Sequence, residues 1–95
     1  MARLLRQNEW LDVRQLEGQI FLIDEEGGRI HHLNETASAL WRLLDTPATR
    51  KEVVAEFRFL FPEEDPVRLK SAIKGLLRDL VETGILKKSE RQPPD

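Results

Sequence analysis

The alternation of apolar and polar positions divides the chain into a strand-forming first half and a helical second half. Apolar and polar residues alternate over residues 11–16, and residues 19–23 are rich in branched and aromatic side chains. A third such run, residues 29–33, follows Gly27 and Gly28. Runs of this kind between turn residues are typical of strands, and consecutive strands usually pair as neighbours. We therefore predict a three-stranded antiparallel meander with residues 29–33 at its edge.

In the second half, apolar residues recur at the i, i+3, i+4 spacing of amphipathic helices. Asn34, Thr49 and Asp65 each stand directly before such a segment, where a side-chain oxygen can cap the first helical turn. Thr49 is followed three residues later by Glu52, the spacing of a capping box. Strands followed by helices predict a small α+β domain. The three helices are expected over residues 35–45, 49–60 and 66–83.

The composition of the two ends differs from that of the middle. Residues 1–9 are polar and mixed, so we expect a flexible N-terminus, and residues 89–95 read as a disordered tail. Residues 10–88 are then one domain, in which the apolar pair Ile85-Leu86 is expected to dock on the meander. Trp41 is expected in the core and Phe59 at a partly exposed position, whereas the role of Trp10 stays open between core and partner surface.

Charge and composition exclude several classes of protein. The 95 residues carry a net charge of −2, which argues against a general polyanion binder, and they contain no cysteine for a disulfide, a thiolate metal site or a nucleophile. No apolar run has the length of a signal peptide core or a membrane span, so a cytoplasmic location is expected. No Ser-His-Asp or Cys-His arrangement and no phosphate-binding glycine loop is present, so an enzyme is not expected.

The pair His31-His32 raises the question of a metal site. Adjacent strand residues point to opposite faces, and no third ligand stands at a recognisable spacing. We therefore expect one histidine to pack inward, the other to lie on the exposed face, and neither to bind a metal.

Four stretches together carry a family resemblance: residues 28–37, residues 40–45, Thr49 with Glu52-Val53, and the closing residues 80–86. The most specific part is Leu33-Asn34-Glu35-Thr36-Ala37 together with the strand that ends at Leu33. Over roughly residues 16–86 the chain resembles the PqqD family, the recognition domains of ribosomally made, post-translationally modified peptides. The resemblance implies a winged helix-turn-helix-like fold without catalytic activity. It also implies that the leader of a precursor peptide binds as an added strand against the third strand, beside the third helix.

Carried onto this sequence, the resemblance implies a peptide-binding site on the third strand and on the strand-facing flank of the third helix. The implied partners are a precursor leader peptide and a modifying enzyme, a radical S-adenosylmethionine protein or another peptide-maturation enzyme. No cofactor, nucleic acid or membrane is implied, and a monomer or weak dimer is expected. The site residues are Arg29, Ile30, His31, His32, Leu33, Lys70, Ile73, Lys74 and Leu77.

Charge on the predicted third helix leaves two interpretations open. Lys70, Lys74 and Arg78 are spaced i, i+4, i+8 and stack on one side of the helix, where like charges repel. An acidic partner would neutralise them, or they form a solvated face near Asp79 and Glu82.

A DNA-binding winged helix is the competing class, because the same layers of helices and strands serve both functions. A DNA reader needs outward basic or amide side chains near the start of its recognition helix. Arg68, Lys70 and Lys74 keep this alternative open, whereas the preceding Glu63-Glu64-Asp65 would repel phosphates.

Overall fold

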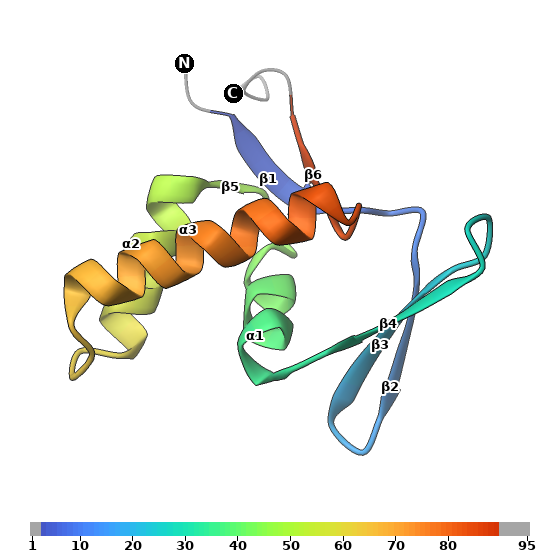
Figure 1. The fold of residues 1–95 in the computed structure, drawn as a ribbon, viewed down its shortest axis with the longest axis horizontal. Helices are drawn as coiled ribbons and strands as arrows, with labels where there is room; N and C mark the ends of the chain where they lie inside the picture. The colour runs from blue at the N-terminus through green and yellow to red at the C-terminus, as the bar shows by residue number, and fades with distance from the viewer. Residues whose placement is uncertain (1–2, 90–95) are drawn as a thin grey trace.

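In the computed structural model, which describes residues 3–89, two small antiparallel sheets accompany three helices (Figure 1). One sheet joins three strands within residues 12–33, in the order of the sequence, and the other joins strands at residues 4–7, 48–49 and 86–88, with residues 4–7 in the middle. The α+β class predicted from the sequence is confirmed. Among residues 3–89, no helix combines the length and the apolar character that crossing a membrane requires.

The predicted meander is present, with β2 at Asp12–Leu16, β3 at Gln19–Asp24 and β4 at Arg29–Leu33. A two-residue turn, Glu17-Gly18, joins β2 to β3, and both residues have positive φ, 51° and 79°. Positive φ at both central positions is the geometry of a type I′ hairpin turn, whose twist matches that of the flanking strands.

The second sheet corrects two expectations about the ends of the chain. Its strands are β1 (Leu4–Gln7), β5 (Ala48–Thr49) and β6 (Leu86–Lys88). The described part of the expected flexible N-terminus, residues 3–9, therefore contains a strand, and Leu86 pairs with Gln7 and not with the meander. The physical reason that this segment is ordered is the burial of Leu5 in the core, where its side chain is 3% exposed. Residues 1–2 and 90–95 lie outside the described residues. Of the expected tail only Ser89 is described, and its backbone amide donates a hydrogen bond to the Leu4 carbonyl over 2.7 Å.

The three helices begin at the predicted caps. Asn34 Oδ1 accepts from the Ala37 amide over 2.8 Å, and Asp65 Oδ1 accepts from the Val67 amide over 3.0 Å. Thr49 and Glu52 form the full capping box, with bonds of 3.1 and 2.8 Å. Each cap satisfies amides that the first helical turn leaves without partners. The helices are α1 (Glu35–Leu43), α2 (Arg50–Leu60) and α3 (Pro66–Glu82).

The core lies where the three helices meet the inner face of β3 and the β1–β6 pair. Ile20 and Leu22 are fully buried, and Trp41 is 6% exposed, as expected for a core residue. Phe59, by contrast, is 79% exposed and lies off the buried face of α2, in agreement with the sequence.

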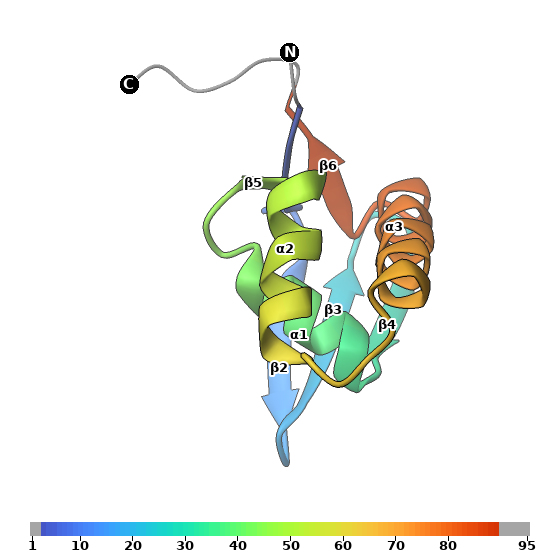
Figure 2. The same ribbon diagram turned by 90° about the vertical axis from the view of Figure 1, so that its left-hand side faces the viewer.

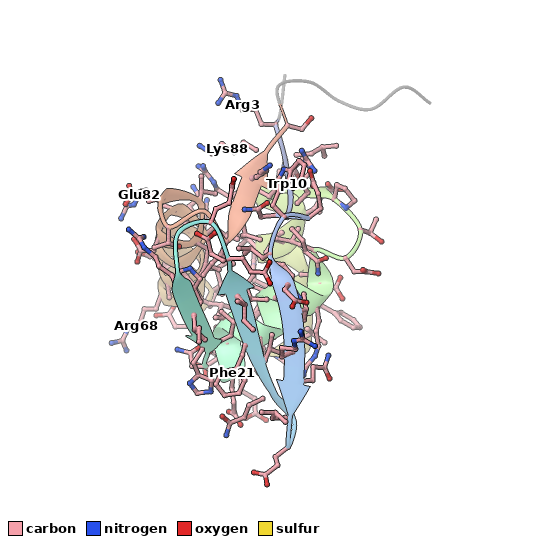
Figure 3. The ribbon with its side chains drawn as sticks, turned by 90° about the vertical axis from the view of Figure 1, so that its right-hand side faces the viewer. Arg3, Trp10, Phe21, Arg68, Glu82 and Lys88 are labelled. Atoms are coloured by element: carbon pink, nitrogen blue, oxygen red, sulfur yellow. The ribbon has the colours of Figure 1, made fainter. Side chains whose placement is uncertain are left out.

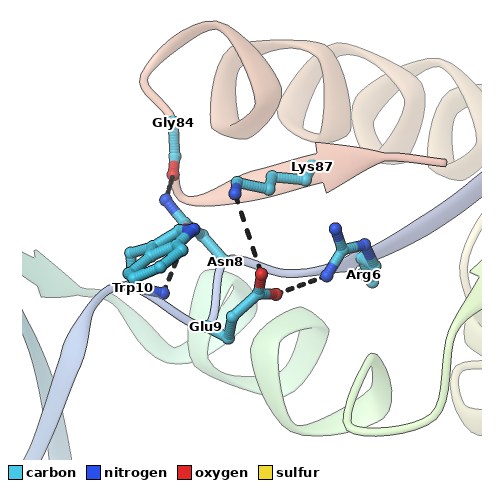
Figure 4. Close-up of polar contacts among 6 residues, drawn as sticks. All are labelled: Arg6, Asn8, Glu9, Trp10, Gly84 and Lys87. Atoms are coloured by element: carbon cyan, nitrogen blue, oxygen red, sulfur yellow. Dashed lines mark hydrogen bonds and ion pairs between the residues drawn. The ribbon is translucent and has the colours of Figure 1, made fainter.

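The segment between β1 and β2 is tied to the end of α3 (Figure 4). The Asn8 amide donates to the Ile85 carbonyl over 3.1 Å, and the Asn8 side chain donates to the Gly84 carbonyl over 2.7 Å. Asn8 Oδ1 also accepts from the Trp10 amide over 3.0 Å. These bonds fix the entry to the meander against the C-terminal end of α3.

Candidate functional site

Strand β4 is an edge of its sheet. It pairs with β3 on one side, and within residues 3–89 no strand pairs with its other side. Figures 2 and 3 show α3 on the β4 side of this sheet, with β2 on the far side. An edge strand presents a row of backbone donors and acceptors that another extended chain can pair with.

The register shows which backbone groups of β4 face outward. The two-residue turn requires Leu16 and Gln19 to be a hydrogen-bonded pair. Because bonding alternates along a central antiparallel strand, Gln19, Phe21 and Ile23 bond to β2, whereas Ile20, Leu22 and Asp24 bond to β4. Their partners on β4 are Leu33, His31 and Arg29. The backbone amides and carbonyls of Ile30 and His32 therefore face the edge that has no partner strand.

The side chains of β4 alternate between two faces. Ile30 is 69% exposed and shares the outer face with His32, whose ring stacks on Phe21 at a centroid distance of 4.8 Å (Phe21 is labelled in Figure 3). His31 is half-buried and Leu33 is buried. One histidine thus packs inward and the other is exposed, as expected. Among residues 3–89 no group of three or more His, Asp or Glu side chains is placed to hold a metal ion.

The C-terminal end of β4 is anchored to α1 without a linker. Leu33 is 5% exposed, and its carbonyl accepts a hydrogen bond from the buried hydroxyl of Ser38 over 3.2 Å. The next residue, Asn34, caps the helix. The edge strand is therefore held in one orientation relative to the core before any partner binds.

The four site residues expected on α3 do not line one groove beside β4. Ile73 and Leu77 are 2% and 1% exposed and belong to the core. Lys70 and Lys74 line a cavity with α2 and the β5-β1-β6 sheet, and no residue of β4 lines that cavity. The four residues are thus divided between the core and the cavity beside α2, and their part in peptide binding stays a prediction. The physical reason is that the buried stripe of α3 faces the core, and the two lysines lie beside it on the side that contacts α2.

A second cavity of about 690 Å³ does adjoin β4, between its inner face and the C-terminal end of α3. His31 lines it from β4, Thr83 from the end of α3, and Trp10 from the β1–β2 connection. Asp24 and Glu25 make its rim acidic. From the sequence, the role of Trp10 stayed open, and neither Asp24 nor Glu25 was expected at the site. The sequence offered one signal for this site, a large aromatic residue directly before a strand. In the structure that residue, Trp10, is 78% exposed.

Charges beside Trp10 form a small exposed network (Figure 4). Glu9 pairs with Arg6, and the Lys87 ammonium lies 3.9 Å from the Glu9 carboxylate and 5.8 Å from the centroid of the Trp10 ring. The pKa of Glu9 lies below its ordinary value, chiefly because the carboxylate accepts a hydrogen bond from its own backbone amide. The hydrogen bond from Arg6 and the positive charges of Arg6 and Lys87 lower this pKa further. The network links β6 to the connection that carries Trp10.

The family model described as coenzyme PQQ synthesis protein D (PqqD) matches residues 19–86. The matched span begins at β3, includes β4 and all three helices, and ends in β6. No curated protein and no solved structure matches the chain.

Proposed function

This chain belongs to the PqqD family, and on that premise we propose that it captures the leader of a ribosomally made precursor peptide by strand addition to β4. Proteins of this family are accessory binding proteins in peptide modification of the kind that makes pyrroloquinoline quinone, and the family is not catalytic. In our proposal the captured peptide is presented to a separate modifying enzyme, a radical S-adenosylmethionine protein or another peptide-maturation enzyme.

The observation that carries the proposal is the edge position of β4. Strand addition draws its affinity from main-chain hydrogen bonds and its specificity from pockets for alternate side chains. The outward backbone groups of Ile30 and His32 supply the donors and acceptors. Because Leu33, Ser38 and Asn34 already hold the strand in place, β4 needs little ordering when a peptide binds.

The two faces of β4 support a side-chain preference in the peptide. On the inner side, alternate peptide residues would approach the cavity lined by His31, Asp24 and Glu25, where a cationic or polar side chain suits the acidic rim. On the outer side, the neighbouring surface is Ile30 and the His32–Phe21 stack, which favours an apolar side chain. We propose that the leader carries this alternation where it pairs with β4.

The proposal also assigns the α3 residues of the site. Ile73 and Leu77 support the site from the core, and their side chains do not contact the peptide. Lys70 and Lys74 take no part in strand addition, because they line the cavity on the other side of α3.

The test uses proline substitutions on the two edges of the same sheet. Ile30→Pro removes one outward amide of β4 and leaves the ladder to β3 intact. Gln15→Pro is the matched control, because the same alternation points the Gln15 amide to the outer edge of β2. Backbone amide shifts of labelled protein are followed during titration with candidate leader peptides.

We expect the peptide to shift the amides of Arg29 to Leu33 in the unchanged protein. Ile30→Pro should weaken binding at least about fivefold, the loss of roughly one hydrogen bond, whereas Gln15→Pro should leave affinity unchanged. The proposal fails if the peptide shifts β2 and not β4, or if both variants bind as well as the parent while their circular dichroism shows a retained fold.

A further inference from the structure

On the side of α3 turned away from β4, two helices and the second sheet surround a basic cavity of about 610 Å³. Arg50, Lys51 and Arg58 line it from α2, and Lys70 and Lys74 line it from α3. These residues come from two helices that pack side by side and are joined by the loop of residues 61–65.

Two more basic residues complete the cavity at the strand end. Arg3 precedes β1 and Lys88 ends β6, and both lie at the same end of the molecule (Figure 3). The sequence contains 15 Lys and Arg residues, and seven of them line this one cavity. The chain as a whole has a net charge of −2, so the basic groups are segregated and not merely abundant.

Among the described residues, these seven side chains share their cavity with no acidic side chain. No Asp or Glu lines the cavity, and none of the seven forms an ion pair within residues 3–89. Lys70 and Lys74 stand one helical turn apart, where like charges repel each other. A cluster of this kind raises the local potential and attracts an anionic partner into the concave surface.

We propose that this basic cavity binds an acidic segment of a partner protein, a short run containing several Asp or Glu residues. The cavity volume lies within the ~300–1,000 Å³ range of small-molecule pockets, which is enough for the side chains of a few acidic residues. Leu5, Val54 and Ala55 give it an apolar floor for the alkyl parts of acidic side chains. Arginine and lysine on the walls supply charge-assisted hydrogen bonds to the carboxylates.

The surroundings favour a short carboxylate segment over nucleic acid. An adjoining cavity shares Ala55 and Arg58 with the basic one and is lined by Glu64. A duplex extending along α2 and α3 would bring its phosphates against that carboxylate, whereas a short segment ends before it reaches Glu64. The basic cavity and β4 lie on different sides of α3, so this inference stands independently of strand addition at β4.

The test uses capped hexaglutamate as the probe and hexaglutamine as the uncharged control, with the full-length labelled protein. Hexaglutamate should shift the amides around Arg50 and Lys51 and around Lys70 and Lys74, leave β4 unmoved, and bind more weakly as salt screens the charges. Lys70→Gln combined with Lys74→Gln should weaken binding about fivefold. The matched pair Arg68→Gln with Arg78→Gln removes the same charge from α3 outside the cavity, and should change affinity less than about twofold.

Several results would overturn the inference. They are an absence of shifts, equal shifts with hexaglutamine, equal losses in both double variants, or shifts confined to β4. Tighter binding of a DNA duplex of matched charge at the same amides would assign the cavity to nucleic acid. Shifts that depend on protein concentration without added probe would assign it to a second copy of the chain. Leader binding at β4 is measured in the same samples, so failure at one site is distinguishable from failure at the other.

Discussion

The side-chain amide of Asn8 donates a hydrogen bond to the backbone carbonyl of Gly84 over 2.7 Å, across 76 positions of the sequence. Gly84 closes α3 with a φ of +84°, and the amides of Gly84 and Ile85 bond back to the carbonyls of Val81 and Leu80. This is the Schellman arrangement of a helix end. Asn8 therefore connects the end of α3 to the start of the meander, and so sets where β4 lies relative to α3.

Replacing Asn8 by alanine should lower the free energy of unfolding by about 1–2 kcal/mol, because the bonds to Gly84 and Trp10 are both lost. Urea denaturation followed by circular dichroism measures the change. Asn8→Asp keeps the acceptor for the Trp10 amide and removes the donor to Gly84, so it should also destabilise. Wild-type stability in both variants would contradict the structural role of this side chain.

Gly75→Ala should raise the free energy of unfolding by about 1 kcal/mol, because alanine favours the helical state in the interior of α3. A Cβ added at Gly75 meets no atom within 4 Å, so no contact opposes the gain. The urea midpoint should rise with an unchanged slope. Gly84→Ala is the control of opposite sign, since its positive φ strains any residue with a Cβ.

Acid titration should reveal the Glu9 network. A folded-state pKa below the ordinary value of 4.5 means that the charged form of Glu9 stabilises the fold above pH 4.5. That contribution is lost as the pH falls through the folded-state pKa. Arg6→Gln removes a hydrogen bond and a positive charge, so the pKa of Glu9, followed by carbon-detected NMR of its carboxyl, should rise toward 4.5. An unchanged pKa in this variant would contradict the assigned cause, and added salt should reduce the difference because the pair is exposed.

Local signals were sufficient for the meander and the helices. The caps at Asn34, Thr49 and Asp65 and the alternation in residues 11–33 are each encoded within a few neighbouring positions, and the structure confirms them. The sheet formed by β1, β5 and β6 was missed because its strands have two to four residues and pair across the whole chain, as in Leu5 with Lys88. So few residues show no periodicity.

Only the strand part of the candidate site was predictable from the sequence. Residues 29–33 form a strand at the expected edge, because strand order followed from sequence order. The flank of α3 occupied by Lys70 and Lys74 was not predictable. Helical periodicity identifies the buried stripe through Ile73 and Leu77, but the neighbour on each side of that stripe depends on how distant elements pack. Here α2 and the missed sheet occupy the lysine side.

The antiparallel pairing of β1 with β6 means that the backbone leaves the domain at the corner where it entered (Figure 1). A catalytic domain joined by a peptide bond before Leu4 or after Lys88 would be tethered at that one corner, at the far end of the molecule from the Glu17-Gly18 turn. Gene fusions in either order would therefore place an enzyme in nearly the same position. In both orders the linker would begin beside Arg3 and Lys88, at the mouth of the basic cavity that these two residues line.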